Sequence, residues 1–427
     1  MLLDFQFRNY RSFREPATLS LAASNYDKTL PGNVISPNLP GLKNQSFLRG
    51  AAIYGPNASG KSNLVLSLWQ LQNLVRTSHT FESGEPLDQE PFRFETESAS
   101  SATCYEVRFV MYGVRYHFRL AFNRERVLEE NLSAFPHGKE QVWYERTWDE
   151  NSAQYHYYSP ETESFTIRKA EQEATKANSL FLSVATNLFD HPKLGKPYRW
   201  FRESLKILNP SIFRGEISDI STLQRLVRDP ELALAMLRQA DLGILDVEIR
   251  KEKISEDLIK LFPKDFMSMI PEGQIDRITM VHQGQDGRVY PLEFEKESAG
   301  TQRYFKLIGP WLSLIESGGV LFLDEIEASL HPLLTRKLVE TVMNPEINTK
   351  NAQIIFTTHD PTLLDLSLLR RDQIWLVEKS QANDSILYPV TEYKMTTRED
   401  LAKGYLSGKY GAVPFLPASL IQNLESD

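Results

Sequence analysis

Alternating apolar and polar positions predict strands in three regions of the chain. The first is the opening 50 residues, with the stretches "LLDFQFRNY" and "ATLSLAAS" and a loop rich in Pro, Gly and Asn. The second runs from 101 to 168 and contains "YEVRFVMY", "VRYHFRLAF", "QVWYERTW" and "YHYYS". The third begins near residue 275 with "IDRITMVHQ" and "VYPLEFE", which the Gly-rich turn "GQDG" joins into a hairpin.

Continuous apolar strands and amphipathic helices alternate elsewhere. The strand "GAAIYG" leads into a helix over about 61–76, and a helix over 302–317 is followed by the strand "GVLFLDE", the helix "PLLTRKLVETVM" and the strands "AQIIFTTH" and "QIWLVEK". This alternation predicts a sheet that is buried on both faces. Between about 170 and 270 the pattern is helical, in segments such as "DPELALAMLRQA" and "SEDLIKLF". No long heptad seam is present, so we expect no coiled-coil arms.

The composition is that of an ordinary globular protein. The 427 residues allow two to three domains, and the net charge of -8 does not suggest a polyanion partner. Cys104 is the single cysteine, which excludes an internal disulfide and favours a reducing compartment, with this residue expected in the core. The first eight residues carry charges, and no apolar run approaches the roughly 20 residues of a membrane span. We therefore expect a cytoplasmic protein without membrane contact.

The stretch "GPNASGKS" matches the P-loop pattern G-x-x-x-x-G-K-[ST] between a predicted strand and a predicted helix. Glycines let successive N–H groups curl around a β-phosphate, the lysine reaches the β- and γ-phosphates, and the serine hydroxyl ligates Mg²⁺. The residues predicted to bind ATP here, with Ser62 also as a metal ligand, are Gly55, Pro56, Asn57, Ala58, Ser59, Gly60, Lys61, Ser62 and Asn63.

Two adjacent carboxylates end the apolar strand in "GVLFLDEIEASLHP". Asp324 is suited to holding Mg²⁺ through its waters, and Glu325 is suited to orienting and polarising the attacking water. Taken alone, the Asp-Glu pair is typical of an ordinary exposed turn. Paired with a P-loop, it predicts the metal and water site of an ATPase.

The strand in "IIFTTHDPTLL" ends on His359. A lone histidine at a strand end is usually structural or solvated. The order of motifs, however, resembles that of the ABC-type ATPases, through "GPNASGKS", "ESAGTQ", "VLFLDE", "ASLHP" and "TTHD". That resemblance covers roughly half of the chain and implies that His359 contacts the γ-phosphate.

The bend in "EKESAGTQRYFKL" is similar to the ABC signature, in which the loop of one subunit closes on the nucleotide held by another. The resemblance implies that Ser298 and Gly300 donate to the γ-phosphate across an interface, and hence that the protein forms a homodimer or a higher homo-oligomer. Glu297, Ala299 and Thr301 depart from the usual L-S-G-G-Q. The alternative is a plain helix N-cap.

Three further stretches refine the resemblance. "FRNYRSF" resembles the N-terminal strand of the SMC/RecF-like branch, which implies that Arg11 and Ser12 lie beside the nucleotide; the alternative is a solvated strand end. In ABC-type heads a glutamine links the bound nucleotide and its metal to motion of the lid. Gln89 is the candidate for this glutamine. The closing "YLSGKYGAVPFL" looks like that of single-head ATPases of phage-defence cassettes, of the RloA and AriA type, and carries no assigned role. Glu378, in "QIWLVEK", is interpreted as a residue at the end of a strand rather than a nuclease ligand.

The predicted fold is α/β: an ABC-type ATPase head, with a mixed sheet core flanked by helices and an antiparallel β lobe, plus a helical insertion. The head is assembled from residues 1–164 and 275–427, and the insertion occupies 165–274. The predicted function is Mg²⁺-dependent ATP hydrolysis. The ATPase is expected to act in phage defence as a sensor or regulator of a separately encoded effector, a nuclease or toxin. Two alternatives are a RecF-like DNA-repair ATPase that binds DNA on the dimer face and an interaction module with little turnover. The basic residues of "VRYHFRLAFNRER" could face nucleic acid, although a solvated sheet face is the favoured interpretation.

Overall fold

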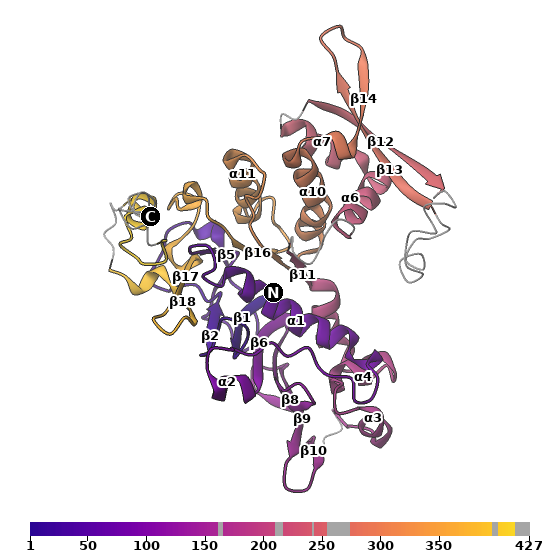
Figure 1. Cartoon of the computed structure of the whole chain (residues 1–427), viewed down its shortest axis with the longest axis vertical. Coiled ribbons are helices and arrows are strands. Elements are labelled where there is room, and N and C mark those ends of the chain that lie inside the picture. Colours follow the sequence, from indigo (N-terminus) through magenta and orange to yellow (C-terminus); the bar gives the residue numbers. More distant parts are fainter. Residues whose placement is uncertain (161–164, 210–216, 241–242, 254–273, 395–399, 415–427) are drawn as a thin grey trace, which may run out of the picture. The chain divides into compact units, whose positions relative to one another are not determined.

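The computed structural model describes residues 1–160, 165–209, 217–240, 243–253, 274–394 and 400–414. The chain folds into two compact units, and Figure 1 shows its elements. Unit 1 consists of Met1–Ile212, Ile315–Ile326 and Arg336–Asp427, and unit 2 of Phe213–Leu314 and Glu327–Thr335. The domain boundaries after residues 164 and 274 stay a prediction.

Unit 1 contains a six-stranded, largely parallel sheet. In spatial order its strands are β11 (Leu205–Leu208), β15 (Val320–Leu323), β16 (Gln353–Thr357), β5 (Gly50–Tyr54), β17 (Ile374–Lys379) and β18 (Ser385–Pro389). Only the β17–β18 pair is antiparallel. Every residue of β5, β15 and β16 is buried. The apolar strands thus form the sheet that the sequence predicts, covered on both faces.

The strands of this sheet alternate with helices that the sequence also predicts. They are α1 (Lys61–Thr77), α10 (Ala299–Ser317) and α11 (Pro332–Met343). Of these, α1 belongs to unit 1, most of α10 belongs to unit 2, and α11 is divided between the two units. The shorter helices of unit 1 are α2 (Thr96–Ser100), α3 (Lys169–Ala174), α4 (Phe181–Asn187), α5 (Gly195–Arg199) and α12 (Leu401–Leu406). Among the described residues, no helix is long and apolar enough to cross a membrane.

A second sheet of unit 1 is antiparallel and forms the predicted β lobe. Its spatial order is β10 (Gln154–Tyr158), β9 (Gln141–Asp149), β8 (Val127–Phe135), β7 (Val114–Phe122), β6 (Thr103–Met111), β1 (Leu2–Arg8) and β2 (Ala17–Ser20). Strand β1 alternates buried and less buried residues, so one face packs into the core and the other faces outward. A short hairpin of β3 (Val34–Ile35) and β4 (Phe47–Leu48) lies apart from this sheet.

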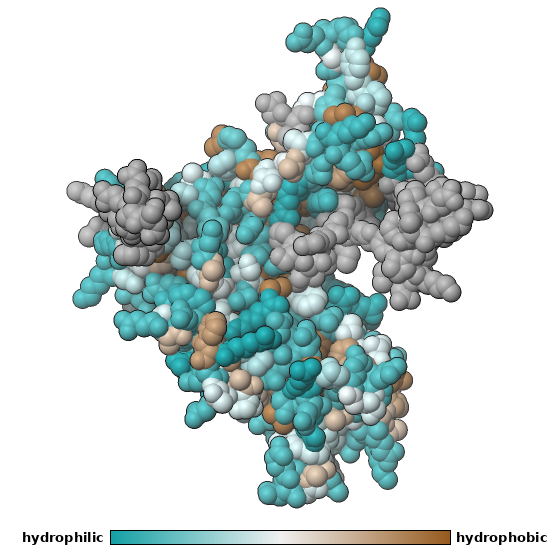
Figure 2. Space-filling model, viewed as in Figure 1, coloured by the Kyte–Doolittle hydropathy of each residue, from teal (hydrophilic) through white to brown (hydrophobic). Residues whose placement is uncertain are grey.

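One hydrophobic cluster joins the two sheets of unit 1. It contains Phe7 and Tyr105 from the β lobe, Ile53 and Phe322 from the parallel sheet and Leu68 from α1. Because α1 begins at Lys61, inside the P-loop motif, this cluster also fixes the loop against the core. The face of the molecule seen in Figure 2 is mainly hydrophilic, with apolar residues scattered over it.

Unit 2 contains α6 (Ile217–Arg228), α7 (Pro230–Gln239) and a sheet with the order β12 (Ile244–Lys253), β13 (Gln274–Gln283) and β14 (Val289–Glu293). Pro310 lies inside α10, where its ring would disturb the helix. Thr222 compensates locally: its hydroxyl donates to the carbonyl of Phe305 at 2.8 Å and accepts the N–H of Gly309 at 2.9 Å. A side chain from α6 therefore replaces one helical hydrogen bond of α10.

The segment expected to be helical differs from its prediction in two places. β11 joins the parallel sheet beside β15, and β12 pairs with β13. A purely helical interpretation is therefore wrong for residues 205–208 and 244–253. Strand pairing overrides local pattern here, because β11 gains a buried neighbour that the sequence does not reveal. The segment "SEDLIKLF" lies outside the described residues.

Candidate functional site

The loop between β5 and α1 has a backbone that only small residues allow. A Cβ placed on Gly55 would lie 2.2 Å from the carbonyl oxygen of Val377, and one placed on Gly60 would lie 2.4 Å from Ser385 Oγ. Gly60 also has a φ of 116°, and Ala58 has a φ of 61°, in the left-handed region that most residues avoid. Such turns direct successive N–H groups toward one side and form a concavity for anions. The loop therefore fits a chain of phosphates.

This loop borders a cavity of about 360 Å³, within the usual size range of ligand sites. Glu325 follows β15 and His359 follows β16, and both residues are exposed. The lining residues are Asn57, Ala58, Ser59, Gly60, Lys61, Ser62, Asn63, Glu325 and His359. They meet because β15, β16 and β5 are neighbouring parallel strands, whose carboxyl ends share one edge of the sheet. The structure thus brings most of the predicted nucleotide residues together.

Asp324 is 3% exposed, and both of its carboxylate oxygens accept hydrogen bonds. Thr357 Oγ1 donates to Oδ1 at 2.6 Å, and Asn209 Nδ2 donates to Oδ2 at 2.9 Å. Each oxygen keeps lone-pair capacity after one such bond. Asp324 is therefore held as an acceptor at the carboxyl end of β15.

The donor set at this edge fits Mg²⁺. Magnesium prefers oxygen ligands, and it is usually bound by one or two carboxylates together with phosphate and water. Ser62 contributes a hydroxyl in the lining of the cavity, and Asp324 contributes its carboxylate one residue before Glu325. Within the described residues, no group of three or more His, Cys, Asp or Glu side chains could hold a metal by itself. A metal here would need phosphate and water oxygens as well.

Lys61 lies over the start of the P-loop. Its Nζ donates to the carbonyl oxygens of Gly55 at 2.8 Å and Pro56 at 3.0 Å, and the residue is 6% exposed. Pro56 and Gly55 are not among the residues that line the cavity, whereas Lys61 is. The ammonium group therefore lies at the start of the P-loop, where it is hydrogen-bonded to the backbone of the first two P-loop residues.

Ser12 lies against the P-loop, although it does not line the cavity. Asn63 Nδ2 donates to Ser12 Oγ at 2.8 Å. Ser385, the first residue of β18, shares a hydrogen bond of 2.8 Å with Ser12 Oγ and contacts the carbonyl oxygen of Ser59 at 2.5 Å. The Ser12 hydroxyl therefore helps to hold the loop in place.

Arg11 and Gln89 have partners outside the cavity. Arg11 forms two hydrogen bonds with the carboxylate of Glu90, at 2.9 Å and 2.7 Å. Gln89 Nε2 donates to the carbonyl of Ser101 at 2.9 Å and to Thr103 Oγ1 at 3.4 Å. Neither residue lines the cavity. The nucleotide role of Arg11 and the metal role of Gln89 stay predictions.

The predicted signature has a local structure of its own in unit 2. Ser298 Oγ accepts the backbone N–H of Thr301 at 3.1 Å, as a cap does at the start of a helix. A Cβ on Gly300 would lie 2.7 Å from the carbonyl oxygen of Ser329, so glycine is needed there for close packing. Both features agree with a helix cap, and the expected contact with a partner's nucleotide stays a prediction.

Three residues of the site have no signal in the sequence. Asn209 follows β11, in a segment whose pattern is helical, and Ser385 follows a turn with no motif. Thr357 belongs to the quoted "TTHD", yet nothing in that motif indicates that its hydroxyl bonds Asp324. Their roles arise from strand pairing between distant parts of the chain.

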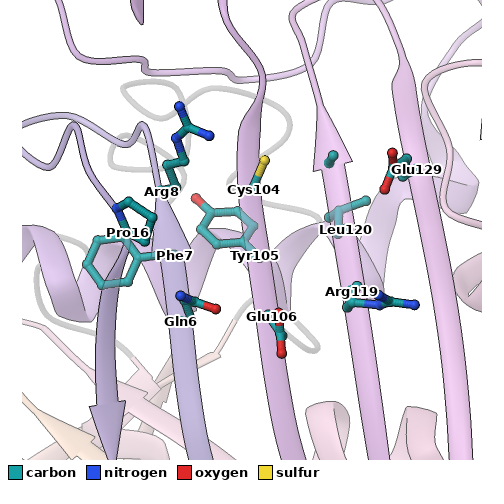
Figure 3. Close-up of a pocket in the computed structure, with 11 residues that line it drawn as sticks. Gln6, Phe7, Arg8, Pro16, Cys104, Tyr105, Glu106, Arg119, Leu120 and Glu129 are labelled. Carbon is teal, nitrogen blue, oxygen red and sulfur yellow. The ribbon is translucent and has the colours of Figure 1, made fainter.

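A second cavity, of about 250 Å³, lies on the β lobe around Cys104 (Figure 3). Cys104 is only partly buried, so it is not the core residue that we expected; burial still raises the pKa of its thiol, which keeps the thiol protonated. Arg8 and Arg119 line the cavity together with Glu106 and Glu129. Because these charges balance, the cavity gives no support to binding of a polyanion.

The largely parallel sheet, the antiparallel lobe and the cavity at the strand ends are the parts expected of an ABC-type head. A family model described as "AAA domain, putative AbiEii toxin, Type IV TA system" matches residues 51–365, well over half of the chain. The chain belongs to this AAA_21 family. It therefore carries an ATPase domain of the AAA class. The predicted mixed sheet and antiparallel β lobe are confirmed by the two sheets of unit 1.

Two solved structures are similar to the chain over most of their length. One is the SMC head bound to the C-winged helix domain of ScpA, with 12% identity, 91% of this chain and 97% of that chain covered, and a TM-score of 0.43. The other is the SMC head domain from Thermotoga maritima, with 14% identity, coverage of 91% and 98%, and a TM-score of 0.36. A comparison with curated proteins gives no match.

Proposed function

We propose that the protein hydrolyses ATP with Mg²⁺ in the cavity bordered by the P-loop, as the regulatory subunit of a defence system. The observation that carries the proposal is the lining of one cavity by a phosphate-binding loop, a carboxylate and a histidine. A loop that fits phosphates beside a candidate base is the combination that phosphoryl transfer to water requires.

Each residue has a distinct task in this proposal. Lys61 and the P-loop N–H groups bind and orient the phosphates, and His359 contacts the γ-phosphate. Glu325 orients the water and accepts its proton, for which its exposed position at the cavity is suitable. Ser62 and Asp324 would hold Mg²⁺, which would neutralise phosphate charge when bound. Positioning and electrostatics supply most of the catalysis in such sites.

The proposal places a second subunit at the site. Ser298 and Gly300 of one copy would donate to the nucleotide of another, in a homodimer or a larger homo-oligomer. The support is the start of α10, a 19-residue helix, because the N-terminus of a long helix favours anions. In this arrangement hydrolysis is slow in a single subunit and fast in the closed assembly.

The regulatory part of the proposal concerns a separately encoded effector in the cytoplasm. The family description names a toxin and a toxin–antitoxin system, which supports a role in defence and a gene partner. The sequence motifs indicate ATPase chemistry and no nuclease chemistry. A separate effector, a nuclease or toxin, would then act when ATP binding or turnover changes the assembly.

The test of this function measures phosphate release and size together. Purified protein is assayed for ATP hydrolysis with and without Mg²⁺, and its mass in solution is measured with and without ATP. We expect Mg²⁺-dependent turnover and a larger species with ATP. A protein that neither hydrolyses nor binds ATP under any of these conditions would overturn the proposal. A rate that rises with added DNA and falls steeply with salt would instead favour the DNA-repair function.

A further inference from the structure

The 400–414 segment, which carries the motif "YLSGKYGA", is fastened to the edge of the parallel sheet. Glu378, in β17, accepts the backbone N–H of Ala412 through Oε2 at 2.8 Å. The hydroxyl of Tyr388, in β18, donates to the carbonyl of Tyr410 at 3.0 Å. A residue that the sequence leaves as an ordinary strand end thus holds a distant segment in place.

The glycines of the motif are explained by this packing. A Cβ on Gly404 would lie 2.6 Å from the hydroxyl oxygen of Tyr410, whose side chain is fully buried. Gly411 has a φ of 69°, and a Cβ there would lie 2.5 Å from Glu378 Oε2. The motif therefore encodes one specific turn rather than a flexible end.

Tyr405, in α12, connects this turn to the P-loop. Its hydroxyl donates to the carbonyl of Ala412 at 3.0 Å. The rings of Tyr405 and Tyr54 meet edge to face, with centroids 5.5 Å apart. Burial raises the pKa of Tyr405 to about 12, so the hydroxyl keeps the proton that it donates at neutral pH.

Gly55, the residue after Tyr54, is held by the lysine of the site. Its carbonyl oxygen accepts Lys61 Nζ at 2.8 Å. The same segment reaches a second strand end: α12 packs on the short helix η6 (Pro361–Leu363), which follows His359 closely in sequence. One segment thus supports two of the three strand ends around the cavity.

We propose that the 400–414 segment is a positioning element of the nucleotide site, with Tyr405 as its positioning residue. Tyr405 packs against Tyr54, the last residue of β5, and so fixes the start of the P-loop, where the Gly55 carbonyl holds Lys61. This inference rests on the proposed function, since it assigns the segment to the same cavity. It accounts for a motif that phosphate chemistry alone does not require.

The test replaces Tyr405 by Phe in the full chain, which removes the hydroxyl and keeps the ring. The Ala412 carbonyl then loses its partner, so the turn holds Tyr405 less firmly against Tyr54. We expect the KM for ATP to rise about 3- to 10-fold, the size of one buried hydrogen bond, while kcat changes less than about 2-fold. Binding of ATP without turnover should weaken by the same factor. The matched control is Tyr198→Phe, which also removes a buried tyrosine hydroxyl, bonded to Asn187 at 3.1 Å, but away from the cavity.

The outcomes separate this inference from the proposed function. A wild-type protein that binds no ATP contradicts the function itself. If wild type binds ATP and Tyr405→Phe has the same KM as Tyr198→Phe, the positioning role is wrong. A merely structural role would lower Tm and the active fraction, hence kcat, with KM unchanged, and that result also overturns the inference. A KM raised above that of Tyr198→Phe supports it, whether or not Tm falls with the lost hydrogen bond.

Discussion

Thr357 Oγ1 donates a hydrogen bond of 2.6 Å to Asp324 Oδ1 and accepts the backbone N–H of Glu325 at 2.8 Å. One hydroxyl at the end of β16 therefore holds both acidic residues at the end of β15. Glu325 has a φ of 52°, a conformation that is costly for a residue with a side chain. The bond from Thr357 supplies a local reason why this turn is stable.

Thr357→Val keeps the shape of the side chain and removes its hydroxyl. Asp324 loses a donor and Glu325 N–H loses its acceptor, so we expect Mg²⁺-dependent turnover to fall by about 10- to 100-fold, as for other residues that orient metal ligands. The measurement is the ATPase rate across a titration of Mg²⁺, in which the variant should need more metal. Thr175→Val is the control, since its hydroxyl also bonds a buried carbonyl, that of Glu171, but not near the cavity. Equal rates for the two variants would contradict this role.

Lys61→Ala removes the cation that faces the phosphates, and we expect ATP binding to be lost, by roughly 100-fold or more in Kd. The side chain also donates to Gly55 and Pro56, so its removal should destabilise the fold slightly. A loss of 1 kcal/mol corresponds to about 2–4 °C in Tm for a large domain, and we expect a shift of that order. Calorimetric titration with ATP and thermal melting check both statements. An unchanged affinity for ATP would make the P-loop assignment wrong.

Glu325→Gln keeps the size of the side chain and removes its basicity. ATP binding should be retained while turnover falls by roughly 100-fold or more, the scale of a positioned general base. Because ATP then persists in the site, the variant should also accumulate as a larger species in sizing experiments with ATP. Glu340→Gln, on α11 and paired with Arg336 at 3.0 Å, serves as the control for loss of a carboxylate. Wild-type turnover in Glu325→Gln would mean that another group orients the water.

The sequence predicts those parts of the head that are continuous in the chain. The P-loop, the strand before Asp324 and the strand before His359 are each read from local pattern, and parallel pairing then brings their ends together. Asn209 is different, because its contact with Asp324 exists only after β11 pairs with β15. No local pattern carries that information. The same holds for Ser385, which reaches the P-loop through the β17–β18 hairpin.

Strand β8 shows a second reason for failure. Its sequence "VLEENLSAF" lacks a clear alternation, because Glu130 is fully buried in the lobe. This carboxylate accepts the hydroxyl of Tyr144 at 2.9 Å and the backbone N–H groups of Phe181 and Leu182, and Arg146 lies 3.6 Å away. A buried charge is tolerated when it is satisfied in this way. Hydrophobic patterning treats the same residue as a solvent-facing position, so this stretch does not stand out within the strand region predicted over 101–168.

The last prediction concerns the predicted signature and requires two variants. Ser298→Arg should leave ATP binding to the isolated subunit intact, because Ser298 does not line the cavity of its own P-loop. It should stop hydrolysis by blocking the closed assembly. The substitution also removes the acceptor for Thr301 N–H, a loss of about 1 kcal/mol, so Tm must be measured alongside.

Mixing Ser298→Arg with Lys61→Ala decides whether the signature acts on a partner, since each variant is inactive alone. A mixed dimer has one site with both defects and one site with neither, in which the intact P-loop of the Ser298 variant faces the intact signature of the Lys61 variant. Turnover should therefore return on mixing, up to about half of the sites in mixed pairs if the sites act independently. Sizing with differently tagged copies first establishes that mixed pairs form. If they form and bind ATP, yet no turnover returns at any ratio, the signature does not act between subunits. Ser298 would then be a local cap, and Gly300 would be required only by its contact with the Ser329 carbonyl.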